Sequence, residues 1–104
     1  MGAWKVWYQP NDKFGRRYHT GTLTIASGQA TFAGKKDTFT IDRARSIEPK
    51  SVGMTTWVHV AYDGGGEPRD AYFVDRKMLG WSGMLGGNDR LRAELEQALL
   101  PASG

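Results

Sequence analysis

The chain has 104 residues, including 14 glycines, four each of Trp, Tyr and Phe, and no cysteine. Without cysteine it cannot hold a disulfide scaffold or a cysteine-ligated zinc or redox centre, its glycines keep no collagen-like period, and its aromatic content favours a folded core over disorder. The formal net charge of +3 is compatible with plain solubility or with attraction to the phosphates of a nucleic acid or an anionic membrane.

Short apolar segments recur about every ten residues and end in turn-forming residues, which is the rhythm of a small all-β barrel or sandwich. Apolar and polar side chains alternate along several of these segments, as expected for strands with one buried face. The predicted strands are residues 3–9, 16–26, 29–33, 38–41, 42–49, 55–62 and 69–75.

The predicted connections between strands use residues that favour turns. Ser27-Gly28 predicts a tight turn, and Gly21 predicts a bulge or bend inside its strand. Pro49 is expected to end the fifth strand, so that residues 50–54 form a loop, and residues 63–68 are expected to form a hairpin loop. These signals divide the first three-quarters of the chain into seven short strands.

The C-terminal part changes pattern. Residues 77–87 predict a glycine-rich connector, and residues 88–100 predict a helix whose apolar side chains recur at spacings of three to four. Asn88 or Asp89 is expected to cap the helix, and Pro101 follows its end. Salt bridges at i,i+4 are expected on the exposed face for the pairs Arg90–Glu94 and Arg92–Glu96. One apolar stripe therefore remains to be covered by the strands.

Five short segments occur in an order that resembles a known group of domains. Gly-Thr-Leu-Thr-Ile at 21–25, followed by Ala-Thr-Phe-Ala-Gly-Lys at 30–35, resembles the opening phrase of GRAM-type and bacterial pleckstrin-homology-like (PH-like) domains. Residues 39–47 resemble the next phrase, and residues 57–62 and 71–75 resemble a later strand pair. The resemblance spans roughly residues 16–100. It implies one PH-like domain over 1–104, a barrel of about seven antiparallel strands capped by a C-terminal helix.

The expected fold is therefore mainly β, with two bent antiparallel sheets of seven strands in all. Inward positions of the strands and the helix stripe should form one core. The predicted core residues are Val6, Leu23, Ile25, Phe32, Phe39, Ile41, Ile47, Val58, Val60, Phe73, Leu91, Leu95 and Leu99.

Few residues point to catalysis. The chain has two histidines, His19 and His59, and an enzyme would need one of them beside a carboxylate in a pocket. Gly80-Trp81-Ser82-Gly83 lacks the last glycine of a nucleophile elbow. No spacing of carboxylates and histidines suggests a metal site. We therefore expect neither an enzymatic activity nor a metal or other cofactor.

Basic residues gather near the predicted turns. In PH-like barrels that bind inositol phosphates, basic residues of the first hairpin and the adjacent strands form the pocket, and the resemblance implies comparable positions here. Asp12 and Asp37 lie in the same turns and weaken the positive field. The tentative residues for an anionic headgroup are Lys5, Lys13, Arg16, Arg17, Lys35 and Lys36.

Two further features leave alternatives open. Residues 80–87 lead into a helix N-terminus, where backbone amides can hold an anion, but close bending of the backbone around packed side chains explains the glycines better. Tyr18, Trp57, His59 and Tyr72 form an aromatic strand face that could stack the bases of a single-stranded nucleic acid.

Three function classes follow from these residues. The first is a non-catalytic interaction module that contacts a protein or peptide through a strand edge or the barrel rim. The second is a reader of acidic lipid headgroups, and the third is single-stranded nucleic-acid binding, which the scattered basic residues disfavour. An edge-strand homodimer is an additional expectation. A cytoplasmic location is expected, with peripheral membrane contact as the alternative, because no apolar leader or spanning segment is visible.

Overall fold

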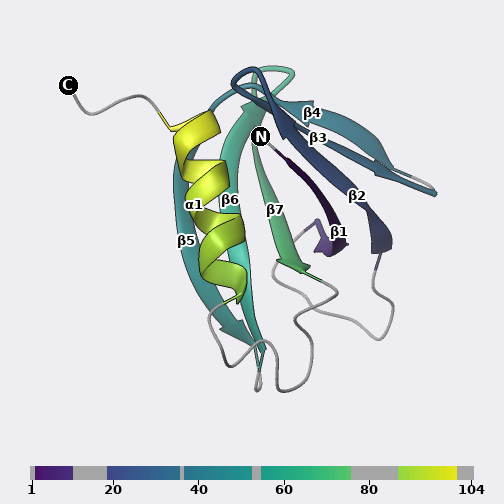
Figure 1. Cartoon of the computed structure of the whole chain (residues 1–104). Helices are drawn as coiled ribbons and strands as arrows, with labels where there is room; N and C mark the ends of the chain where they lie inside the picture. The colour runs from purple at the N-terminus through teal and green to yellow at the C-terminus, as the bar shows by residue number, and fades with distance from the viewer. Residues whose placement is uncertain (1, 11–18, 36, 53–54, 76–86, 101–104) are drawn as a thin grey trace.

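The computed structural model of the chain describes residues 2–10, 19–35, 37–52, 55–75 and 87–100. These residues form seven strands followed by one helix (Figure 1). The elements are β1 (Gly2–Gln9), β2 (His19–Ala26), β3 (Gln29–Gly34), β4 (Thr38–Ile41), β5 (Ala44–Val52), β6 (Thr55–Gly64), β7 (Glu67–Asp75) and α1 (Gly87–Leu99). The mainly β fold with a C-terminal helix is confirmed.

All seven strands belong to one antiparallel sheet with the order β4-β3-β2-β1-β7-β6-β5. Strand β1 joins its two halves, because it pairs with β2 from Gly2 to Tyr8 and with β7 from Val6 to Gln9. The prediction of two separate sheets is wrong for this reason. Alternation along each strand shows which face is buried, but it does not show which strands share hydrogen bonds.

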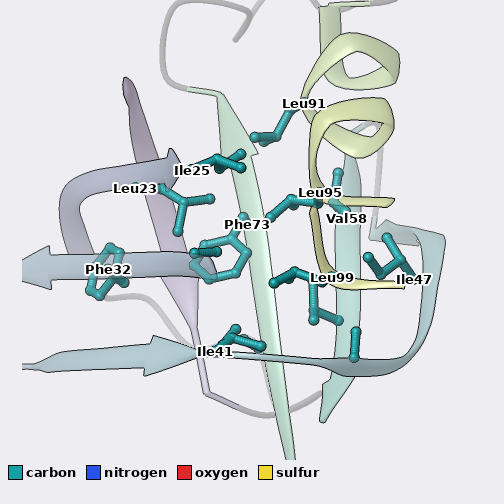
Figure 2. Close-up of a cluster of buried hydrophobic side chains, with 14 of the residues drawn as sticks. Leu23, Ile25, Phe32, Ile41, Ile47, Val58, Phe73, Leu91, Leu95 and Leu99 are labelled. Atoms are coloured by element: carbon teal, nitrogen blue, oxygen red, sulfur yellow. The ribbon is translucent and has the colours of Figure 1, made fainter. Parts of the chain in front are cut away.

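Helix α1 lies inside the curve of the sheet and contacts strands of both halves, namely β2, β3, β5, β6 and β7 (Figure 1). Leu91, Leu95 and Leu99 project from α1 toward the sheet and are fully buried (Figure 2). The apolar stripe expected for this helix is confirmed. Through this stripe, α1 covers apolar side chains from both halves of the sheet at once.

Aromatic rings fill another part of the core. The ring centroid of Tyr8 lies 4.8 Å from that of Phe32 and 5.2 Å from that of Phe39. The rings of Phe39 on β4 and Tyr62 on β6 stack with centroids 6.1 Å apart, although β4 and β6 are far apart in the strand order. The sheet is therefore strongly curled. Every predicted core residue lies in this core, with Phe39 partly buried, but the prediction omitted Tyr8 and Tyr62.

Strand β5 continues past the proline that was expected to end it. Pro49 pairs with Val58, and the register continues through Lys50 and Ser51 to Val52. The predicted loop at residues 50–54 is therefore wrong for its first three residues. Among the described strands β5 pairs with β6 alone, and a proline is tolerated at a sheet edge because its missing N–H can face away from the ladder.

Two hairpins use tight turns with positive φ. Ser27 and Gly28 have φ of 55° and 76°, and Gly65 and Gly66 have φ of 63° and 81°. Positive φ at both central residues is the requirement of a two-residue type I′ hairpin. The Ser27-Gly28 turn is confirmed. The hairpin predicted at residues 63–68 is also present, but its turn is shorter than predicted, because β6 extends to Gly64 and β7 begins at Glu67.

Gly21 does not form a bulge, because its pairings with Val6 and Gly34 continue the register on both sides. A Cβ atom there would lie 2.6 Å from the Ala33 carbonyl oxygen and 2.7 Å from the Phe32 ring. Close packing of that ring thus explains the glycine. A shift of register occurs instead in β5, between Ala44 and Ser46.

Helix α1 has 13 residues, and no helix in the described part of the chain is long and apolar enough to cross a membrane. The Arg92–Glu96 ion pair, at 3.7 Å, confirms one predicted i,i+4 contact. Glu94 is half-buried beside Gly2, so its predicted exposed placement is wrong. The predictions for the connector at 77–86, for the capping side chains of Asn88 and Asp89 and for Pro101 lie outside the described residues or side chains.

Candidate functional site

Two of the predicted basic residues meet at one hollow. Lys5 and Lys35 both line a shallow hollow of about 280 Å³. Lys5 is aligned with Thr22 of β2, which is aligned with Ala33 of β3, so that register brings the first strand close to the end of the third. The remaining lining comes from Thr20, Thr22, Ala33, Gly21 and Gly34. Two ammonium groups and two hydroxyls can bind a phosphate-sized anion there.

The other four predicted basic residues lie outside the described residues: Lys13, Arg16, Arg17 and Lys36. The acidic neighbour Asp37 is engaged by His19, whose Nδ1 lies 3.2 Å from Asp37 Oδ2. Lys35 precedes Asp37 in a turn closed by the Gly34 N–H, which donates to the Asp37 carbonyl at 2.8 Å. This turn holds Lys35 at the end of β3, beside the hollow.

A second hollow, of about 430 Å³, lies where β7 ends beside β1. It is lined by Gly2, Ala3, Trp4, Lys5, Thr22, Asp75 and Glu94. Asp75 is the last residue of β7 and only 3% exposed, and Glu94 approaches from α1. The Trp4 indole Nε1 is buried and has no hydrogen-bond partner in the described part of the chain. The prediction from sequence missed this group because its members come from four separate elements, β1, β2, β7 and α1.

A third hollow, of about 550 Å³, lies at the corner between β4 and β5 and is lined by Asp42, Arg43, Ala44, Arg45 and Asp63. Asp42 Oδ1 accepts a hydrogen bond from Gln29 Nε2 at 2.6 Å, and Arg45 pairs with Asp63 at 3.3 Å. The two arginines were not predicted as site residues. Paired opposite charges of this kind are typical of a solvated corner.

Both histidines contact carboxylates. His59 Nε2 lies 2.8 Å from Asp70 Oδ1, and the imidazole stacks on Tyr72 with ring centroids 4.4 Å apart and planes at 7°. His19 contacts Asp37 on a different part of the sheet. The three hollows described above are lined by other residues. Among the described residues, no three His, Cys, Asp or Glu side chains form a group that could hold a metal ion.

The aromatic face proposed for base stacking is largely covered. Trp57, Tyr72 and Val74 form a second buried cluster, with Trp7 packed against it. Trp57 is 2% exposed and Tyr72 is 5% exposed, which leaves little ring surface for a base. Tyr18, the fourth predicted member, lies outside the described residues.

Burial raises the pKa of two tyrosine hydroxyls in the aromatic part of the core. Desolvation, together with the neighbouring Tyr62 and Asp37, raises the pKa of Tyr8 from 10.0 to about 12. Burial also raises the pKa of Tyr62. The neutral phenols are therefore the forms that the folded chain favours.

Stability is expected to fall as the pH rises from about 10 to about 12. Because the pKa of Tyr8 is higher in the folded chain, the unfolded chain loses this proton first, so the stabilisation is complete below about pH 10 and disappears through about pH 12. Urea unfolding across this range should show a shallower alkaline decline for Tyr8→Phe than for the wild type. Parallel declines would contradict the assignment to Tyr8.

Comparisons of the chain with protein-family models, with curated proteins and with solved structures find no match. Functional assignment therefore rests on the hollows, edges and charged groups described above.

Proposed function

We propose that the chain is a non-catalytic interaction module of the PH-like, GRAM-like type that binds an extended segment of a protein or peptide partner along a strand edge. Seven antiparallel strands and a C-terminal helix are the elements that the resemblance over residues 16–100 implies, and they support it. The observation that carries the binding mode is the unequal pairing of β1. Strand addition to an open edge is a common way to bind peptides because main-chain hydrogen bonds supply affinity for many sequences.

Strand β1 has one half, Gly2–Lys5, whose β7 side is covered by no strand in the described part of the chain, and we call it the open half of β1. Strand β1 pairs with β2 from Gly2 through Tyr8, but with β7 only from Val6 to Gln9. Within the described residues, Gly2–Lys5 therefore has no neighbour on the β7 side. Backbone groups on that side need hydrogen-bond partners, which water or an added strand can supply.

The two outer edges of the sheet suit a partner less well. Strand β4 has four residues. Strand β5 is longer, but it carries Pro49 and the exposed charged residues Arg45, Glu48 and Lys50. Proline and charged side chains are the usual means of preventing edge-to-edge pairing. The open half of β1 is therefore the edge that we assign to the partner.

The test uses acetylated and amidated pentapeptides, Thr-Val-Arg-Val-Thr and Thr-Val-Gln-Val-Thr, followed in ¹H–¹⁵N spectra. Saturable shifts of the Gly2–Lys5 amides are expected, with a Kd of about 1 mM or lower. Peptides N-methylated at alternate residues are matched controls, since they cannot complete the ladder, and they should not bind. Shifts confined to β5, or equal binding of the methylated peptides, would overturn strand addition at β1.

Binding of an acidic lipid headgroup is a second candidate, supported by the hollow that Lys5 and Lys35 share. The wild type is expected to float with phosphatidylcholine vesicles that contain about 20% phosphatidylserine at low salt. The double variant Lys5→Glu, Lys35→Glu should lose most of this binding, whereas Lys50→Glu on β5 should retain it. Absence of wild-type flotation, or equal loss in the Lys50→Glu control, would reject the headgroup site.

A further inference from the structure

We propose that the hollow lined by Trp4, Asp75 and Glu94 receives one basic side chain, Lys or Arg, of the partner segment. Its link to a bound strand rests on the proposed function, because the hollow lies directly beside the open half of β1. The preference for a cation comes from the residues of the hollow itself. A cation-binding hollow specifies a basic residue in the partner segment, whereas strand addition alone specifies no side chain.

The two carboxylates give the hollow its preference for a cation. Asp75 comes from the end of β7 and is nearly fully buried, and Glu94 comes from the middle of α1 and is half-buried. Both also interact with other groups of the protein, and a carboxylate can accept several hydrogen bonds. A guanidinium or ammonium group that enters between β7 and α1 can make charge-assisted hydrogen bonds with these two carboxylates. Such bonds are stronger in this partly desolvated hollow than at the open surface.

Trp4 adds a polar and an apolar contact. Its indole Nε1 is buried and makes no hydrogen bond within the described part of the chain, which is a costly state for an N–H donor. A carbonyl oxygen of a segment lying along β1 would satisfy this donor. The half-buried ring also offers a surface for the aliphatic stem or the cationic head of the inserted side chain.

Gly2 keeps the hollow open. A Cβ atom at this position would lie 3.0 Å from Glu94 Oε1 and 3.5 Å from Trp4 Nε1, so any side chain here would enter the space between them. The volume of about 430 Å³ is sufficient for one long basic side chain. Lys5 also lines the hollow, and its positive charge disfavours a second basic residue next to the first.

The experiment follows the Trp4 indole N–H signal, assigned by its loss in Trp4→Phe. The probes are the Thr-Val-Arg-Val-Thr peptide, its analogue with neutral citrulline in place of arginine, and N-acetylarginine amide. The arginine probes should shift the Trp4 signal, and the arginine peptide should bind at least about tenfold more tightly than the citrulline peptide. Glu94→Gln should remove this preference, whereas Glu96→Gln, on the same helix but outside the hollow, should preserve it.

Gly2→Val provides a second variant that keeps both carboxylates and fills the hollow, and it should also abolish the preference. Equal binding of the arginine and citrulline peptides at the Gly2–Lys5 amides would overturn the cation site and leave strand addition standing. A Trp4 shift with N-acetylarginine amide, without any peptide shift at those amides, would support the cation site and reject strand addition. Equal effects of Glu94→Gln and Glu96→Gln, or no shift of the Trp4 signal with either arginine probe, would overturn the cation site.

Discussion

Gly21→Ala is expected to lower the free energy of unfolding by about 1–3 kcal/mol, because overpacking a filled core forces side chains and backbone to shift. The new Cβ would lie 2.6 Å from the Ala33 carbonyl oxygen and 2.7 Å from two atoms of the Phe32 ring. Neither group can move freely, since the carbonyl belongs to β3 and the ring is fully buried. Thermal unfolding should show a decrease in Tm of about 4–8 °C for each kcal/mol lost.

Two controls separate this clash from a general effect of losing a glycine. Gly64→Ala is the matched variant, because the nearest atoms there belong to the long side chain of Arg69, which can move aside. Phe32→Leu should relieve part of the clash, so the double variant should be more stable than the sum of the two single effects. Additive losses, or an equal loss in Gly64→Ala, would contradict the packing explanation.

Leu95→Ala is expected to destabilise the fold by about 2–5 kcal/mol, the range observed when a buried leucine is truncated in a core that cannot collapse around the cavity. Leu95 is 0% exposed and lies between Leu91 and Leu99 in the stripe that faces the sheet (Figure 2). The cavity would open where the two halves of the sheet meet the same helix. Urea denaturation followed by circular dichroism measures the loss.

Gln97→Ala is the control for Leu95→Ala, because Gln97 lies on the same helix and is exposed. Its unfolding free energy should stay within about 0.5 kcal/mol of the wild type. A Leu95→Ala protein as stable as Gln97→Ala would show that α1 is not part of the cooperative core. The two variants therefore test whether the helix belongs to the folded unit.

The spacing of apolar residues along the sequence was sufficient to predict most of the strands and the helix. Alternation along β2 and β6 placed Leu23, Ile25, Val58 and Val60 in the core, and the spacing of three to four placed Leu95 there. These predictions succeeded because side-chain direction within one strand or helix depends on residues a few positions apart. Pro49 misled the prediction because its effect depends on whether its strand lies at an edge, which is a property of the whole sheet.

The candidate sites depended more on long-range pairing. Lys5 and Lys35 were selected as basic residues near turns, and the registers of β1, β2 and β3 place them at one hollow. Neither the arginines of the β4–β5 corner nor the Trp4 hollow was predicted. Asp75 was predicted only as the last residue of a strand, and Glu94 was predicted on the exposed face of the helix.

The sequence by itself determined the mainly β class, the seven strands, the apolar stripe of the final helix and the inward residues of the core, because each follows from spacing along a few residues. Tertiary structure decided that β1 joins both halves of one sheet and that its pairing with β7 stops at Val6. It also decided that Asp75, Glu94 and Trp4 share a hollow. Contacts of this kind depend on the register and curl of the whole sheet, and a periodicity within single segments carries no information about them.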